Sequence, residues 1–291
     1  MLRLRSFLPV LAGTLMIMAV VLINGRPSVF TDTDDYFIEG RTFAYTIAYA
    51  LNIKHPDPPP TDPQDIADAQ QAAADLHMSH TEIGARSPYY GLLLYATQRV
   101  GTIWLLAVIQ AAIGAWMVFL LWRTLIPKAP EWTAYAVQGV VAAASTLPFF
   151  AGFAMPDVFS GYAVIATALL LIVWERLARW ERAALAVLLG LSITFHASHL
   201  LDVIAVAIVG VGLLWRLKAP AYTARVAAVS AAVAAAVFTG FIYKAAVQLK
   251  TGDEMRRPPF MAIRITADGP GRRYLAYACD HGETYALCQF R

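Results

Sequence analysis

The apolar stretch FLPVLAGTLMIMAVVLI (residues 7–23) is followed closely by the acidic stretch TDTDDYFIEGRTF (residues 31–43), and this pairing decides the fold. The first stretch has 17 residues and no charged side chain, which approaches the length of a membrane-spanning helix. The basic segment MLRLRS precedes it, and no small-residue cleavage pattern follows it. We therefore predict an uncleaved signal anchor over residues 1–24, with its basic end in the cytoplasm.

The composition of the whole chain is that of a membrane protein. Of its 291 residues, 58% are hydrophobic and 15% are charged, and the mean hydropathy is +0.54. These values are too apolar for a soluble domain of this size. The net charge of +3 comes from basic residues scattered around the ends of apolar runs, so we expect no nucleic-acid partner.

Apolar runs elsewhere in the chain predict six further crossings. They cover residues 101–122, 132–150, 158–174, 183–215 and 222–249. The run over 183–215 is too long for one crossing and contains the polar break TFHASH at residues 194–199, so we predict two short helices in a hairpin. The predicted fold is all-α, a polytopic membrane helix bundle of about seven spans.

The distribution of basic residues predicts the orientation of this bundle. If the N-terminus is cytoplasmic, three basic loops fall on the cytoplasmic side, where such residues are favoured. These loops contain Arg123, Lys128, Arg176, Arg179, Arg182, Arg216 and Lys218. The tail is basic as well, but the inner loops agree with one another, so the C-terminus is expected outside. The expected location is the bacterial cytoplasmic (inner) membrane.

The chain then has four segments: the signal anchor 1–24, the extracytoplasmic loop 25–101, the helix bundle 102–249 and the extracytoplasmic tail 250–291. Within the loop, residues 41–53 and 87–101 have the apolar and aromatic spacing of helices that lie in the membrane interface. Residues 54–64 are rich in proline and predict an extended linker. Residues 65–80 are rich in alanine and predict a helix.

The tail contains the two cysteines of the chain, Cys279 and Cys288. A disulfide is allowed on the extracytoplasmic side, and this spacing suits a local link. We predict that they form a disulfide, and the alternative is two unrelated thiols.

Polar residues from distant parts of the sequence converge on the same side. They are the carboxylates of TDTDD, Asp157 in a turn, and His196 and His199 in the hairpin. Such groups are expensive near a bilayer and tend to mark a site or pathway. We therefore expect an extracytoplasmic cavity.

Three stretches resemble the GT-C membrane glycosyltransferases, which include protein O-mannosyltransferases and lipid A aminoarabinose transferases. They are DTDDYFIEGRTF (32–43), RSPYYGLLLYATQRVGTIWLLAVIQAAIGAWMVFLLW (86–122) and TLPFFAGFAMPDVFSGYAVIATALLL (146–171). The resemblance is one of pattern and covers roughly residues 1–215. The chain departs from it in having the single Pro88 where a pair is common and Gln110 near where an arginine is common.

This resemblance implies a polyprenyl-phosphate-sugar donor, used at the extracytoplasmic face beside membrane lipid. Asp34 or Asp35 would take the proton of the acceptor. The residues implied in substrate binding are Asp157, His196, His199, Arg86 and Tyr89. Some members of the family use a divalent metal, and the oxygens of DTDD could hold one, although nothing in the sequence requires it.

Each of these features also has a structural explanation. The acidic stretch could cap a helix N-terminus, and Asp157 could end a turn. The histidines share a helical arc with Asp202 and could bind a metal, but interfacial hydrogen bonds are the commoner role. The second function class is therefore a non-catalytic polytopic protein, an accessory subunit or assembly factor that binds a protein partner through its outer loops. A transporter is less favoured, because the spans contain few central charges and no inverted repeat.

Overall fold

The computed structural model describes residues 2–50, 86–251, 265, 269–282, 285 and 288. Apart from one isolated bridge between Ser28 and Phe153, the elements within these ranges are helices, so the predicted all-α class is confirmed. The described residues belong to two compact units, one with residues 2–50 and 86–250 and the other with α13 (Pro270–Asp280).

The first unit contains all the other helices. They are α1 (Leu2–Asn24), α2 (Thr31–Ala50), α4 (Pro88–Val100), α5 (Ile103–Leu125), α6 (Trp132–Ala144), α7 (Leu147–Ala151), α8 (Val158–Ile172), the 3-10 turn η1 (Trp174–Arg176), α9 (Arg179–Phe195), α10 (His199–Arg216) and α11 (Tyr222–Thr251).

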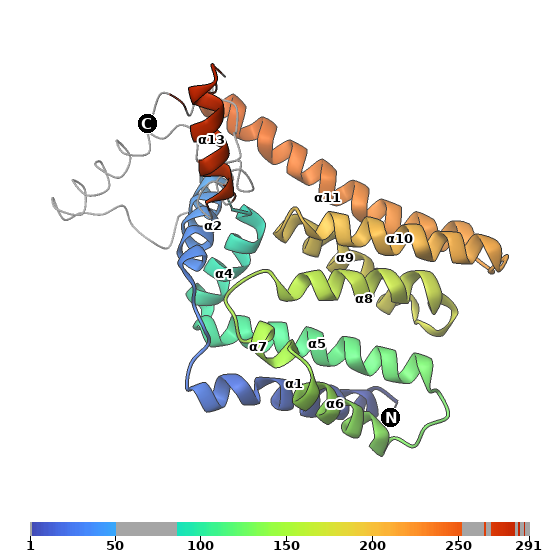
Figure 1. The fold of residues 1–291 in the computed structure, drawn as a ribbon. Coiled ribbons are helices and arrows are strands. Elements are labelled where there is room, and N and C mark those ends of the chain that lie inside the picture. Colours follow the sequence, from blue (N-terminus) through green and yellow to red (C-terminus); the bar gives the residue numbers. More distant parts are fainter. Residues whose placement is uncertain are drawn as a thin grey trace. The chain divides into compact units, whose positions relative to one another are not determined.

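A bundle of side-by-side helices forms most of this unit (Figure 1). α5 packs against α1 on one side and α8 on the other, and α8 also packs against α9 and α10. The core of the bundle follows α8, whose Phe159, Ala163 and Leu170 are buried. α9 and α10 meet at residues 196–198, so the structure contains the hairpin predicted at TFHASH.

Four helices in the described part are long and apolar enough to cross a membrane: Phe7–Asn24, Ile103–Leu125, His199–Arg216 and Tyr222–Leu249. The predicted count was about seven, but α6, α8 and α9 have only 13, 15 and 17 residues. Large apolar side chains on the long helices, such as Ile208 on α10 and Phe241 on α11, are exposed in the isolated chain. Both features are compatible with a membrane protein.

The structure divides the crossing predicted at 132–150 into α6 and the short α7. The break falls at Ser145, whose hydroxyl donates to the Val141 carbonyl at 2.6 Å and accepts from the Leu147 N–H at 3.2 Å. Pro148, next in α7, has no N–H with which to continue the α6 hydrogen-bond ladder. The proline and the serine side chain together explain why one apolar run gives two helices.

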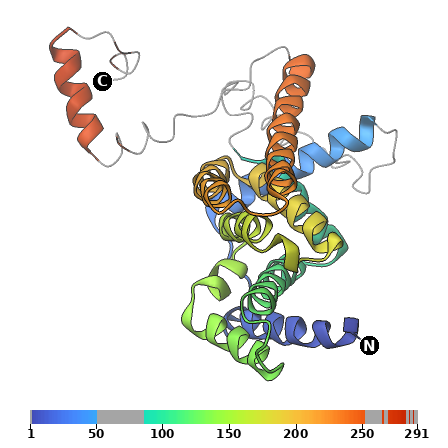
Figure 2. The same ribbon diagram turned by 90° about the vertical axis from the view of Figure 1, so that its right-hand side faces the viewer.

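Helices α2 and α4 run across one end of the bundle. In Figure 2 α10 is seen nearly end-on while α2, in light blue, extends sideways. α2 begins at Thr31, well before the helix predicted over 41–53, and α4 matches the helix predicted over 87–101. The linker predicted over 54–64 and the helix predicted over 65–80 lie outside the described residues.

The crossing of α2 and α4 depends on two glycines. A methyl group added at Gly40 would overlap the backbone of Gly91, and one added at Gly91 would overlap the Tyr36 carbonyl oxygen and lie 2.7 Å from the Gly40 nitrogen. The two backbones are therefore in direct contact. Tyr36 and Tyr90 are buried at this crossing with their rings edge to face, 5.1 Å between centroids.

In the second unit, the structure joins Cys279, near the end of α13, to Cys288 in a disulfide. This is the pair proposed from the sequence. Because α13 ends at Asp280, the link fastens the residues that follow the helix back to its last turn.

We expect neither cysteine to react with a polyethylene-glycol maleimide until the protein is reduced, after which both should react. The measurement is the mobility of the denatured protein on a gel, with protein extracted under thiol-free conditions. The double variant Cys279→Ser/Cys288→Ser should show no shift in either lane. Labelling of the unreduced wild type would contradict the disulfide and would argue against an extracytoplasmic tail.

Candidate functional site

Arg86 lies beside the first turns of α2. Its Nη2 is 2.7 Å from Oδ1 of Asp32, and its Nε is 3.7 Å from Oδ2 of Asp35. The guanidinium also faces the ring of Tyr36, with Cζ 5.9 Å from the ring centroid. Residues 32, 35 and 36 share one face of α2 because they are three and four positions apart. Arg86 binds that face.

Ser87 fixes the position of Arg86. Its hydroxyl accepts from the Tyr89 and Tyr90 N–H groups and so caps the N-terminus of α4. The same hydroxyl donates to the Thr194 carbonyl at 2.6 Å, near the end of α9. The start of α4 is thereby attached to the α9–α10 hairpin, and Arg86 lies at the junction.

Asp157 is brought to α2 by backbone pairing. The Ser28 N–H donates to the Gly152 carbonyl, and the Ala154 N–H donates to the Ser28 carbonyl, both at 2.9 Å. The Thr33 hydroxyl on α2 donates to the Ala154 carbonyl at 3.1 Å. These bonds hold the segment before α8 against the start of α2, so that the exposed Asp157 lies within electrostatic range of Tyr36.

Tyr36 is buried beneath these charged residues, with 2% of its surface exposed. Burial raises the pKa of its phenol well above the usual value, and the Arg86 guanidinium acts in the opposite direction. Asp157, Asp32 and Asp35 raise this pKa further. The phenol therefore stays protonated at physiological pH.

The two histidines of the hairpin differ in environment. His199 is buried, and its Nδ1 donates to the Ser192 carbonyl at 2.7 Å, which leaves Nε2 as the acceptor of the neutral ring. His196 is exposed, with its ring centroid 5.4 Å from that of His199. Asp157 and Asp202 both lie within electrostatic range of His199. Asp202 accepts from the Ser160 hydroxyl at 2.8 Å, which connects α10 to α8.

These residues form one group, which we name the polar cluster: Asp32, Asp35, Tyr36, Arg86, Asp157, His196, His199 and Asp202. It combines side chains from α2 and α10 with residues beside α4, α8 and α9. Of the residues proposed from the sequence, it contains Asp35, Arg86, Asp157, His196 and His199.

Two residues proposed from the sequence lie apart from the polar cluster. Asp34 is exposed, lies on another face of α2, and forms no ion pair within the described part of the chain. The Tyr89 hydroxyl donates to the Thr239 carbonyl of α11 at 2.9 Å, and its ring packs against Phe43 and Tyr243. Tyr89 therefore joins helices rather than facing the polar cluster.

The catalytic and binding residues proposed from the sequence included neither Asp32 nor Tyr36, and Asp32 and Asp202 were given only as possible metal ligands. The signal for the first two was the spacing of 32, 35 and 36, which places them on one face once the helix is known to begin at Thr31. The signal for Asp202 was its position one turn after the histidines on α10.

The chemistry of the polar cluster is dominated by carboxylates. Four carboxylates accompany one guanidinium, so the polar cluster is acidic and suited to accept protons and to bind hydroxyl groups. Within the described residues, no three His, Cys, Asp or Glu side chains are grouped so as to hold a metal ion. Neither of the two metal sites suggested by the sequence, at DTDD and at the histidines, has such a group of ligands among the described residues.

Comparison with known proteins gives no relative. No family model, no curated protein and no solved structure matches the chain. The resemblance to the GT-C glycosyltransferases therefore stays a prediction from the sequence.

Proposed function

We propose that the chain is an integral membrane glycosyltransferase of the GT-C type. It would cross the bacterial cytoplasmic membrane about seven times, with its N-terminus inside, and move a sugar from a polyprenyl-phosphate donor to an acceptor at the extracytoplasmic face. The observation that supports this proposal is the polar cluster, where α2, α8 and the α9–α10 hairpin bring carboxylates, histidines and an arginine together at one end of an apolar bundle (Figure 1).

Asp35 is the better candidate for the general base in this proposal. Its side chain is 59% exposed and 3.7 Å from Arg86, whereas that of Asp32 is 40% exposed and 2.7 Å from Arg86. Asp32 therefore holds the guanidinium, and Asp35 is available to the acceptor. It would take the acceptor hydroxyl proton as the oxygen bonds to the anomeric carbon, while the bond to the phosphate oxygen breaks and polyprenyl phosphate leaves.

The departing phosphate needs positive charge or hydrogen-bond donors. Arg86 is the cation of the polar cluster, and His196 is its exposed imidazole. Because Arg86 contacts two carboxylates, a phosphate would compete with them for the guanidinium. The longer contact, to Asp35, is the one that would be given up.

The same ion pairs also favour the alternative, a non-catalytic accessory subunit or assembly factor. Arg86 joins α4 to α2 without any ligand, as a purely structural arginine would. In that case the exposed carboxylates form part of a surface for a protein partner.

We expect the wild type to bind polyprenyl-phosphate-sugar saturably and to release polyprenyl phosphate when acceptor is supplied. Asp35→Asn should retain binding and lose release by about 10²–10⁴-fold, the usual contribution of general acid–base catalysis. Arg86→Gln should weaken binding of both the donor and polyprenyl phosphate. Native mass spectrometry in detergent reports all of these species, including the loss of the sugar mass.

Asp34→Asn is the matched control, because it changes the neighbouring carboxylate on a different face of α2. It should behave as the wild type. Donor binding no stronger than that of bulk phospholipid would rule out the glycosyltransferase. Normal release by Asp35→Asn would instead reject the role of Asp35, and a normally folded protein without donor binding would favour the accessory subunit.

A further inference from the structure

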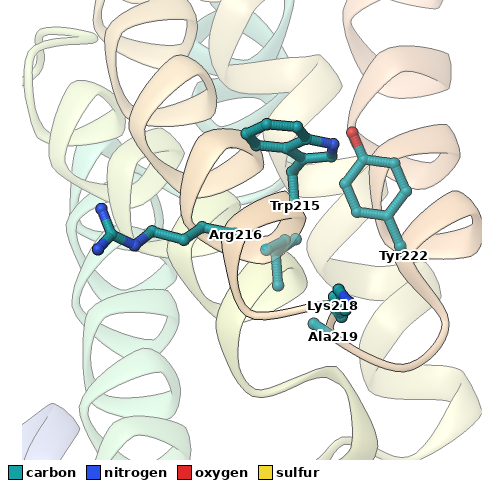
Figure 3. Close-up of a pocket in the computed structure, with 6 residues that line it drawn as sticks. Trp215, Arg216, Lys218, Ala219 and Tyr222 are labelled. Carbon is teal, nitrogen blue, oxygen red and sulfur yellow. The ribbon is translucent and has the colours of Figure 1, made fainter.

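The turn between α10 and α11 carries an open pocket that the proposed function does not use. It has a volume of about 510 Å³ and is lined by Leu214, Trp215, Arg216, Lys218, Ala219 and Tyr222 (Figure 3). Pockets for small molecules and head groups are typically about 300–1,000 Å³. In Figure 3 the Trp215 and Tyr222 rings lie on one side, and the Arg216 side chain extends to the other.

The position of this pocket follows from the helices that flank it. α10 and α11 are both candidate membrane spans, and residues 217–221 connect them. A turn between two spans lies at the boundary between lipid and water. Trp215, which is 75% exposed, and Tyr222 are residues enriched at that boundary.

Several basic residues at this end of the bundle are bound to other parts of the bundle. Arg123 forms two hydrogen bonds with Glu181, and Arg225 pairs with Glu175 at 3.5 Å. Arg176 donates to the Thr124 carbonyl.

Arg216 and Lys218 differ from these basic residues. Neither forms an ion pair with any residue in the described part of the chain, and both line the pocket. Two uncompensated cations beside an apolar, aromatic hollow provide the complement of a lipid with a negatively charged head group.

The backbone of Lys218 forms part of the turn that ends α10. Its φ of 48° is left-handed, at a position just after a helix where glycine is favoured. The Lys218 N–H donates to the Trp215 carbonyl and the Ala219 N–H to the Leu214 carbonyl, so the turn closes the end of α10. Ala221 in the same turn has a left-handed φ of 52° as well, so this conformation belongs to the turn, from which Lys218 lines the pocket.

We propose that this pocket binds the phosphate head group of an anionic phospholipid, with Arg216 and Lys218 contacting the phosphate and Trp215 and Tyr222 contacting the glycerol and upper chains. Basic pockets between spans bind such head groups in other membrane proteins. The proposal is independent of the polar cluster, which lies beside α2.

The experiment is native mass spectrometry of the full chain with phosphatidylglycerol or phosphatidylcholine added in turn. The wild type should retain phosphatidylglycerol in preference to phosphatidylcholine. The double variant Arg216→Gln/Lys218→Gly should lose this preference by about tenfold or more, because each basic residue near a membrane surface attracts anionic lipid. Glycine suits the left-handed backbone at residue 218, so the double variant should fold as the wild type does.

Lys128→Gln is the matched control, since Lys128 is an exposed cation of the α5–α6 connection and does not line the pocket. It should leave the preference unchanged. An equal loss in this control would show general charge attraction and overturn the site. Equal retention of the two lipids by the wild type would also overturn the site. Competition by glycerol 3-phosphate as strong as that by the whole lipid would do the same.

Discussion

Gly91→Ala should prevent α4 from packing on α2 and, with Gly40→Ala, should be among the most damaging glycine-to-alanine changes in the described part of the chain. The added Cβ would overlap the Tyr36 carbonyl oxygen and lie 2.9 Å from the Gly40 Cα. Both obstacles are backbone atoms, so no side-chain rotation relieves the overlap. Overpacking in a core typically costs about 1–3 kcal/mol, and here we expect the upper end of that range or more.

Thermal unfolding in detergent, followed by the amount of monodisperse protein on size-exclusion chromatography, measures this effect. Gly161→Ala on α8 and Gly212→Ala on α10 are matched controls, because a Cβ at either glycine meets no atom within 4 Å. Both controls should be neutral or stabilising, since alanine favours helix over glycine by about 1 kcal/mol. A Gly91→Ala protein as stable as these controls would show that α2 and α4 do not cross at this contact.

This contact also matters for the polar cluster. Asp35 precedes Gly40 on α2, and Arg86 precedes Gly91 at the start of α4. The glycine contact therefore sets the distance at which the carboxylate and the guanidinium meet. A Gly91→Ala protein that still folds should have lost the pairing of Arg86 with Asp32 and Asp35.

The sequence predicted the helices and the hairpin that carry the polar residues. It did not predict which of the neighbouring aspartates contacts Arg86. Composition and apolar runs predicted the helix bundle, and the break at TFHASH predicted the hairpin that carries His196 and His199. The choice between Asp34 and Asp35 depends on where α2 begins. The sequence predicted a helix only from residue 41, and a helix that begins at Thr31 turns Asp35, not Asp34, toward Arg86.

Gln110 is a second residue whose contacts the sequence did not predict. A polar residue within an apolar run gives no indication of what it contacts. In the structure it is fully buried: its amide donates to the Ala151 and Phe153 carbonyls at 2.9 Å and accepts from the Tyr90 hydroxyl at 3.2 Å. It holds the non-helical backbone before α8, which leads to Asp157. Those carbonyls lie between the end of α7 and the start of α8, where the sequence predicted a turn between two crossings but not the residue that binds it.

Glu181→Gln should destabilise the other end of the bundle by about 1–3 kcal/mol, the usual cost of leaving a buried hydrogen-bonding group without its partner, since the Arg123 side chain is 34% exposed. Glu181 is 2% exposed, and its two oxygens accept from Nη1 and Nη2 of Arg123 at 2.8 and 2.7 Å. One of these oxygens also accepts from the Ala178 N–H at the start of α9. The neutral amide would leave the Arg123 charge without its counterion and would weaken this cap.

Glu175→Gln is the matched control at the same end of the bundle. The Glu175 side chain is 53% exposed and its oxygen is 3.5 Å from the buried Arg225, which also donates to the Leu171 carbonyl at 2.8 Å, so the loss of Glu175 should cost about 0–1 kcal/mol. The two variants remove the same charge and differ only in burial and geometry. Equal unfolding temperatures for them would show that the Arg123–Glu181 pair is accessible to water in solution. A large difference would instead show that the Arg123–Glu181 pair holds α9 against α5.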